Sequence, residues 1–170
     1  EEKIPHDEKV FSIFEQHTEW ISKGKAGVPQ ELGLKVCILE DPHGFITHHQ
    51  VMQKQTDDQI AVPFIKKAKE LFPNLSGCSF DKGFYSPENV KELNELLDKV
   101  VLPKKGKPSK KEKEIQSSDE FIQARRQHSA IESAINALEN HGLDRCPDRG
   151  PDAFVRYVSL SVLSRNIQII

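Results

Sequence analysis

The sequence predicts a mixed α/β fold, in which helices flank a sheet that contains both parallel and antiparallel strands. Two observations carry this prediction. From Leu32 onward, short apolar runs typical of strands alternate with amphipathic patterns of helical period. In the second half of the chain each strand-like run is followed by a helix, and this order favours parallel pairing. With 170 residues the chain has the length of one domain, 1–170.

The first predicted elements are an irregular strand and a β-hairpin. Over Val10–Ile21 apolar and polar residues alternate in part, and a glycine-rich loop that reaches Pro29 ends this strand. Two further apolar runs, 32–39 and 45–52, are joined by the turn-forming sequence Asp-Pro-His-Gly. This arrangement predicts that the two runs pair as antiparallel strands.

The middle of the chain predicts two helices and two short strands. The first helix covers 56–71, because Thr56 and a glutamine three residues later resemble a capping box and apolar residues follow at helical spacing. A short apolar strand at 75–80 comes next. A serine and a proline then open a second helix at 86–97, and 99–102 forms another short strand.

A change of composition follows this strand. The segment at about 104–118 is rich in lysine and has almost no apolar residue, which predicts a flexible basic loop. Such a loop either contacts nucleic-acid phosphates or is a solvated surface segment, and both interpretations remain open. The candidate phosphate contacts are Lys104, Lys105, Lys107, Lys110 and Lys111.

Two helices complete the predicted fold. From Phe121 apolar residues recur at spacings of three and four, which predicts one long helix ending near Gly142. Beside that apolar stripe lies a polar one that includes Glu132, so we expect Glu132 at the edge of the core, facing a cleft. The last helix begins at Pro151 and has little polar face, which predicts that it is largely buried.

The composition excludes several classes of protein. With 36% hydrophobic and 29% charged residues the chain resembles a soluble globular domain, and no apolar run approaches the roughly 18 residues of a membrane span. We therefore expect a cytoplasmic protein with no membrane partner. Three cysteines without a CxxC spacing indicate neither a disulfide framework nor a zinc site. They are Cys37, Cys78 and Cys146, of which the first two lie in apolar runs and are expected to be reduced core residues.

Asp81 and Glu132 are the candidate catalytic residues. Asp81 directly follows a predicted strand, and α/β sheets place their sites at the carboxyl ends of strands. The long helix can cross back over that end and bring Glu132 to it. Paired carboxylates suit Mg²⁺ or Mn²⁺, which cleave phosphodiesters in two-metal sites. The alternative is that Asp81 only forms a turn and that Glu132 is a solvated helix residue.

Several motifs resemble the catalytic domain of DDE-type insertion-sequence transposases. The segment 78–86 resembles the family's second-aspartate motif, an apolar strand followed by Asp-x-Gly-Tyr/Phe. The segment 125–132 is similar to the third motif, in which basic residues precede the catalytic glutamate. Further resemblances cover nearly the whole chain: Gln55–Asp58 at a helix start, Leu163–Ile167 near the C-terminus, and Phe14–Lys25.

This resemblance implies an RNase H-like fold in which Asp81 and Glu132 hold two Mg²⁺ or Mn²⁺ ions. It also implies DNA cleavage and strand transfer at transposon ends, binding of transposon-end and target DNA, a homodimer on DNA, and a nucleoid-associated bacterial protein. The pattern needs a further aspartate on a first strand. We expect that aspartate, with the first element of the fold, upstream of Glu1, and Glu15 is the weaker candidate within the chain. Residues 1–170 alone are then expected to be inactive.

Other side chains have two interpretations each. Arg125, Arg126 and His128 are candidate DNA contacts, or they lie on an exposed or core-edge face of the helix. Adjacent His48 and His49 point to opposite faces of a strand, so we expect no shared metal ion there. Two other functions also remain open. One is a non-catalytic, truncated transposase that binds DNA, and the other is an RNase H-like nuclease that joins no ends.

Overall fold

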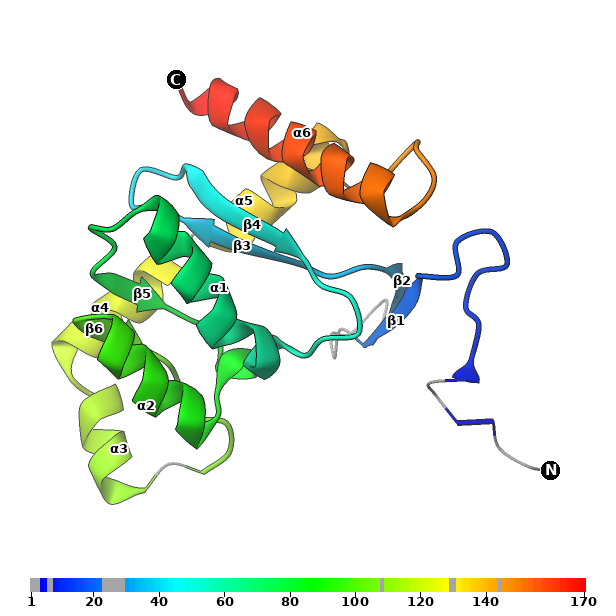
Figure 1. Ribbon diagram of the computed structural model, residues 1–170. Coiled ribbons are helices and arrows are strands. Elements are labelled where there is room, and N and C mark those ends of the chain that lie inside the picture. The colour runs from blue at the N-terminus through cyan, green and yellow to red at the C-terminus, as the bar shows by residue number, and fades with distance from the viewer. Residues whose placement is uncertain (1–3, 6–7, 23–29, 108, 129–130, 144) are drawn as a thin grey trace.

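The computed structural model in Figure 1 describes residues 4–5, 8–22, 30–107, 109–128, 131–143 and 145–170. The mixed α/β class is confirmed, since helices and strands alternate along the described chain. The prediction of one mixed sheet was wrong, because the described strands form three separate two-stranded sheets. None of the helices in these residues is long and apolar enough to cross a membrane.

The first sheet is an antiparallel pair, β1 (Glu19–Ser22) and β2 (Gln30–Gly33). The predicted strand over 10–21 is therefore confirmed only at its end. A strand persists where a neighbour supplies hydrogen bonds, and residues 10–18 pair with no strand in the described chain. Trp20 packs on Phe11, with the ring centroids 5.6 Å apart, which favours a structural role for this tryptophan.

The predicted hairpin is confirmed as β3 (Val36–Glu40) and β4 (Ile46–Val51), which pair antiparallel. The Asp41 carboxylate shapes the turn by accepting hydrogen bonds from the N–H groups of residues 43 and 45, both at 2.9 Å. The two histidines of β4 point to opposite faces, as predicted. The His48 ring lies 4.6 Å from that of Phe64, and His49 Nε2 lies 3.1 Å from the Ser159 hydroxyl.

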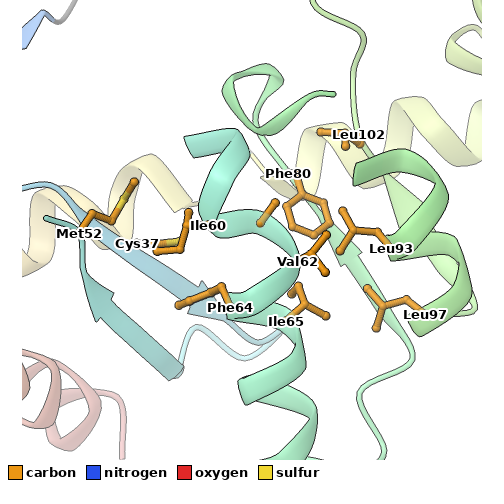
Figure 2. Close-up of a cluster of buried hydrophobic side chains, with 11 residues drawn as sticks. Cys37, Met52, Ile60, Val62, Phe64, Ile65, Phe80, Leu93, Leu97 and Leu102 are labelled. Carbon is orange, nitrogen blue, oxygen red and sulfur yellow. The ribbon is translucent and has the colours of Figure 1, made fainter. Parts of the chain in front are cut away.

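Helix α1 (Asp57–Leu71) covers one face of this hairpin and also packs against α2 (Pro87–Leu96). Its predicted start is confirmed, since the Thr56 N–H donates to the Gln59 side chain at 3.0 Å. Figure 2 shows the apolar side chains that meet between these elements. This first core contains Cys37, Met52, Ile60, Ala61, Val62, Phe64, Ile65, Phe80, Leu93, Leu97 and Leu102.

Helix α6 (Pro151–Ile169) covers the opposite face of the hairpin and starts at the predicted residue. The prediction that it is largely buried was wrong. Only one side of it packs against β4 and the turn after α5, so the remaining apolar side chains face solvent. The buried side carries Val158 and Val162, whereas Val155, Leu160, Leu163 and Ile167 are exposed.

The basic segment is a loop only in its first part. Lys110–Gln116 forms helix α3, so the prediction of a loop over 104–118 was wrong there. Five of these seven residues are lysine or glutamate, which have good helix propensity, so the helix can form without a large apolar face. The predicted long helix consists of α4 (Asp119–His128) and α5 (Ile131–Leu138), and residues 129–130 between them lie outside the described part.

Candidate functional site

The candidate site lies at the carboxyl end of a parallel strand pair. Strands β5 (Gly77–Ser79) and β6 (Lys99–Val101) pair in parallel, which confirms the predicted parallel arrangement. The ladder continues one residue further, because the Phe80 N–H donates to the Val101 carbonyl at 2.8 Å. Asp81 is the next residue, and it is exposed. The structure therefore places this carboxylate at the strand end, as the sequence predicts.

A tight turn, η2 (Lys82–Phe84), follows Asp81. It is closed by two hydrogen bonds: Phe84 N–H donates to the Asp81 carbonyl at 3.1 Å, and Tyr85 N–H donates to the Lys82 carbonyl at 3.2 Å. The Phe84 ring packs on buried Phe80, with centroids 5.8 Å apart. The backbone of Asp81 is thus held on both sides, by the strand before it and by the turn after it.

The Asp81 side chain has the chemistry that a divalent cation requires. Its carboxylate makes no hydrogen bond or ion pair with any described residue, and carboxylate oxygens are suitable ligands for a hard cation such as Mg²⁺. In the described part of the chain, no three histidine, cysteine or acidic side chains gather as a metal site. Glu132 lies in α5, and its side chain is outside what the structure describes.

The helical segment before Glu132 lies beside the same strand pair. Helix α4 packs against both β5 and β6, and Phe121 of this helix is buried. Arg125 of α4 is exposed, whereas the side chains of Arg126 and His128 lie outside the described residues. The polypeptide therefore returns to the strand pair shortly before the predicted glutamate.

The basic segment supplies exposed positive charge after β6. The side chains of Lys105, Lys107 and Lys110 are exposed, and that of Lys104 is partly exposed. Lys111 belongs to α3, and its side chain is not among those described. These lysines follow the strand that pairs with β5, so the segment starts at the end of the sheet where Asp81 lies.

Gly83 of the turn lies against the Asp57 carboxylate, at the first turn of α1. A Cβ added to Gly83 would lie 2.8 Å from Asp57 Oδ2, closer than real Cβ contacts. The other oxygen, Asp57 Oδ1, lies 3.2 Å from the Lys35 ammonium, which restrains the carboxylate. A Cβ at Gly83 would therefore have to displace the Asp57 carboxylate, whereas the φ of Gly83, which is not in the left-handed region, does not itself require glycine. The glycine of the Asp-x-Gly motif thus lies against Asp57, a residue distant from it in sequence.

Replacing Gly83 by alanine is expected to destabilise the fold by about 1–3 kcal/mol, because the new methyl group collides with Asp57. In an Asp57→Ala background the oxygen is absent and the remaining Cβ is 3.6 Å away, so the same substitution should be neutral or stabilising. Urea unfolding of the four variants measures this coupling. Gly33→Ala is the control, since nothing lies within 4 Å of its added Cβ. Equal effects of Gly83→Ala in both backgrounds would refute the contact.

Sequence reasoning missed the role of Asn89. This side chain is 8% exposed, and its amide nitrogen donates to the carbonyls of Asp58 and Phe84 at 2.7 and 2.8 Å. The sequence showed Asn89 only as part of a helix start, in which its N–H donates to the Ser86 hydroxyl at 3.0 Å. Its position three residues after the capping serine is the one sequence signal that could have drawn attention to it.

Glu15 does not occupy a first strand. It lies in an irregular segment, and its Oε2 accepts a hydrogen bond from the Gly150 N–H at 3.0 Å and lies 3.4 Å from His17 Nδ1. It lines a cavity of about 540 Å³ between β2, β3, α5 and the start of α6. The residues that line this cavity do not include Asp81. The Glu15 carboxylate thus bonds within this part of the fold and is not placed beside Asp81, which argues against Glu15 as a further member of the predicted site.

The cysteines are free, and Cys37 is buried. Burial raises the pKa of the Cys37 thiol to about 12, with Asp57 adding to the effect, and burial also raises the pKa of the Cys78 thiol to about 12. Both are therefore neutral thiols at physiological pH rather than nucleophiles. The prediction of reduced core cysteines is confirmed for Cys37 and Cys78.

A comparison with known families gives a match that covers almost the whole chain. The family described as "Transposase DDE domain" matches residues 1–167. Comparisons with characterised proteins and with solved structures give no significant match.

Proposed function

The chain belongs to the family of transposase DDE domains, and we propose that it cleaves DNA at transposon ends and transfers the cut strands, using divalent metal ions. The observation that carries this proposal is the position of Asp81. Its carboxylate is exposed, bonded to no described residue, and located at the carboxyl end of β5. Helix α4 packs across the same strand pair and leads directly toward Glu132.

Asp81 and Glu132 would hold the metal ions. When bound, Mg²⁺ or Mn²⁺ supplies charge stabilisation and lowers the pKa of a bound water or hydroxyl. The protein residues position this chemistry: the strand end and the turn fix the Asp81 backbone, and the helix carries Glu132. Carboxylate oxygens are the ligands that these hard cations prefer.

The family resemblance implies a third carboxylate on a further strand, in addition to Asp81 and Glu132. The strand edges that are unpaired in the described part of the chain are places where such a strand could pair. Among the described strands, β3 pairs only with β4 and β5 only with β6, so each has one edge that can accept a further strand. Glu15 is engaged with Gly150 and is not needed for this role.

The exposed lysines after β6 would contact the DNA backbone. Replacing Lys105, Lys107 and Lys110 together by glutamine should weaken DNA binding and reduce the slope of log K against log salt by about 2 to 3, since each phosphate contact contributes about 0.9. The matched control replaces three exposed lysines elsewhere, Lys66, Lys67 and Lys91, with the same change of charge. Fluorescence anisotropy over a salt series measures both. Equal slopes for the two triple variants would exclude the basic segment as the DNA contact.

The experiment that tests the function follows a labelled DNA that ends in the element's inverted repeat, incubated with the complete transposase and Mg²⁺. Cleavage at the repeat, followed by joining of the labelled end to a target plasmid, is the expected result. A nuclease without transfer activity would yield only shorter fragments. A protein that binds DNA without cutting it would shift the DNA in a gel and leave its length unchanged. Either of these results would contradict the proposed cleavage and strand transfer.

A further inference from the structure

We propose that Asn89 and Gly83 are positioning residues for Asp81: they hold the turn that follows it against the first turn of α1 and so fix where its carboxylate meets a metal ion. This inference rests on the proposed function, because it assigns the metal contact to Asp81. We call the two contacts, the Asn89 hydrogen bonds and the packing of Gly83 on Asp57, the turn clamp.

The first part of the turn clamp is a double hydrogen bond. Both hydrogens of the Asn89 amide group are used, one on the Asp58 carbonyl of α1 and one on the Phe84 carbonyl of the turn. Asn89 is 8% exposed, so water cannot readily replace these bonds. Loss of this buried donor removes one hydrogen bond from each of the two carbonyls and releases the turn from α1, which favours rearrangement of the turn.

The second part is the close packing of Gly83 on Asp57. A side chain added at Gly83 would have to displace the Asp57 carboxylate, and the ion pair with Lys35, the residue before β3, restrains that carboxylate. The turn is therefore tied to α1 and Lys35 through one contact, and to α1 and α2 through the other. Both contacts involve residues that lie far from the turn in sequence.

The turn clamp acts on Asp81 through one residue, Phe84. Phe84 donates its N–H to the Asp81 carbonyl at 3.1 Å and offers its own carbonyl to Asn89 at 2.8 Å. On the other side, Asp81 follows Phe80, whose N–H is bonded to β6. If the Asn89 side chain is removed, the hydrogen bond between Phe80 and β6 before Asp81 remains. The turn after Asp81 then loses its hydrogen bond to Asn89. The Asp81 carboxylate then samples more positions, and the metal ion binds more weakly.

The test measures Mn²⁺ binding by electron paramagnetic resonance, together with amide hydrogen exchange at residues 82–85. Asn89→Ala is expected to weaken Mn²⁺ binding about tenfold, the order found for residues that orient metal ligands, and to speed exchange at the Phe84 and Tyr85 amides. Asn94→Ala is the matched control. Asn94 also lies on α2, but it is exposed and its amide bonds only to Val90 of its own helix.

Gly83→Ala provides a second, independent variant should Asn89→Ala fail to fold. It is expected to weaken Mn²⁺ binding as well, and adding Asp57→Ala should restore the affinity because the collision is relieved. Failure of this rescue would overturn the proposal for Gly83.

The outcomes separate this inference from the proposed function. If Asp81→Ala abolishes Mn²⁺ binding while Asn89→Ala behaves like Asn94→Ala, the turn clamp does not position Asp81 and the inference is wrong, but the metal site stands. If Asp81→Ala binds Mn²⁺ as the unaltered chain does, the proposed function fails at Asp81 and the inference fails with it. If Asn89→Ala loses Mn²⁺ affinity and Asn94→Ala does not, the result supports both the turn clamp and the metal site at Asp81.

Discussion

Replacing Asp81 by alanine is expected to abolish metal-dependent DNA cleavage and to leave the fold intact. The fold survives because the Asp81 side chain is exposed and bonded to no described residue, so its removal should change the free energy of unfolding by less than about 0.5 kcal/mol. Cleavage is lost because a metal ligand contributes several kcal/mol to the transition state. A loss of about 4 kcal/mol corresponds to about a thousandfold slower reaction.

The measurement is the initial rate of cleavage of a labelled transposon end by the complete transposase in Mg²⁺, with circular dichroism as the check on folding. Asp98→Ala is the matched control, since Asp98 is also exposed but precedes β6, at the opposite end of the strand pair from Asp81. Cleavage at the original rate by Asp81→Ala would remove Asp81 from the catalytic site.

Replacing Asn166 by alanine is expected to lower the free energy of unfolding by about 3 kcal/mol. The Asn166 side chain makes two hydrogen bonds to the backbone of β4, as a neighbouring strand would. Ile46 N–H donates to Asn166 Oδ1, and Asn166 Nδ2 donates to the Ile46 carbonyl, both at 2.9 Å. The Ile46 side chain is 3% exposed in the second core. Removing the amide leaves a partly buried donor and acceptor unsatisfied, at about 1–3 kcal/mol each.

Urea unfolding of the chain measures this effect, and Leu163→Ala on the exposed side of the same helix is the control. A change within about 0.5 kcal/mol for Asn166→Ala would show that α6 is held by its apolar contacts alone. The sequence had singled out the segment around Asn166 only by its resemblance to the family's C-terminal ending. The structure supplies its physical reason, which is to attach α6 to the hairpin.

The sequence by itself determined the elements whose causes are local. Thr56 and Ser86 are capping residues whose partners lie three positions away, and both helices begin where these residues predict. The hairpin follows from a turn that Asp41 closes with its own neighbours. Asp81 was placed at a strand end because the apolar run stops directly before it. These features need no knowledge of the rest of the chain.

Only the tertiary structure decided what distant residues do to one another. The requirement for Gly83 comes from Asp57, the role of Asn89 comes from carbonyls on two other elements, and Asn166 bonds to a strand near the other end of the chain. Periodicity and composition describe one segment at a time, so they indicate that a residue is polar or small but not which partner makes it necessary. The same reason explains why the prediction that α6 is largely buried was wrong. Its apolar residues lie on several sides of the helix, but only the side that packs against β4 is buried.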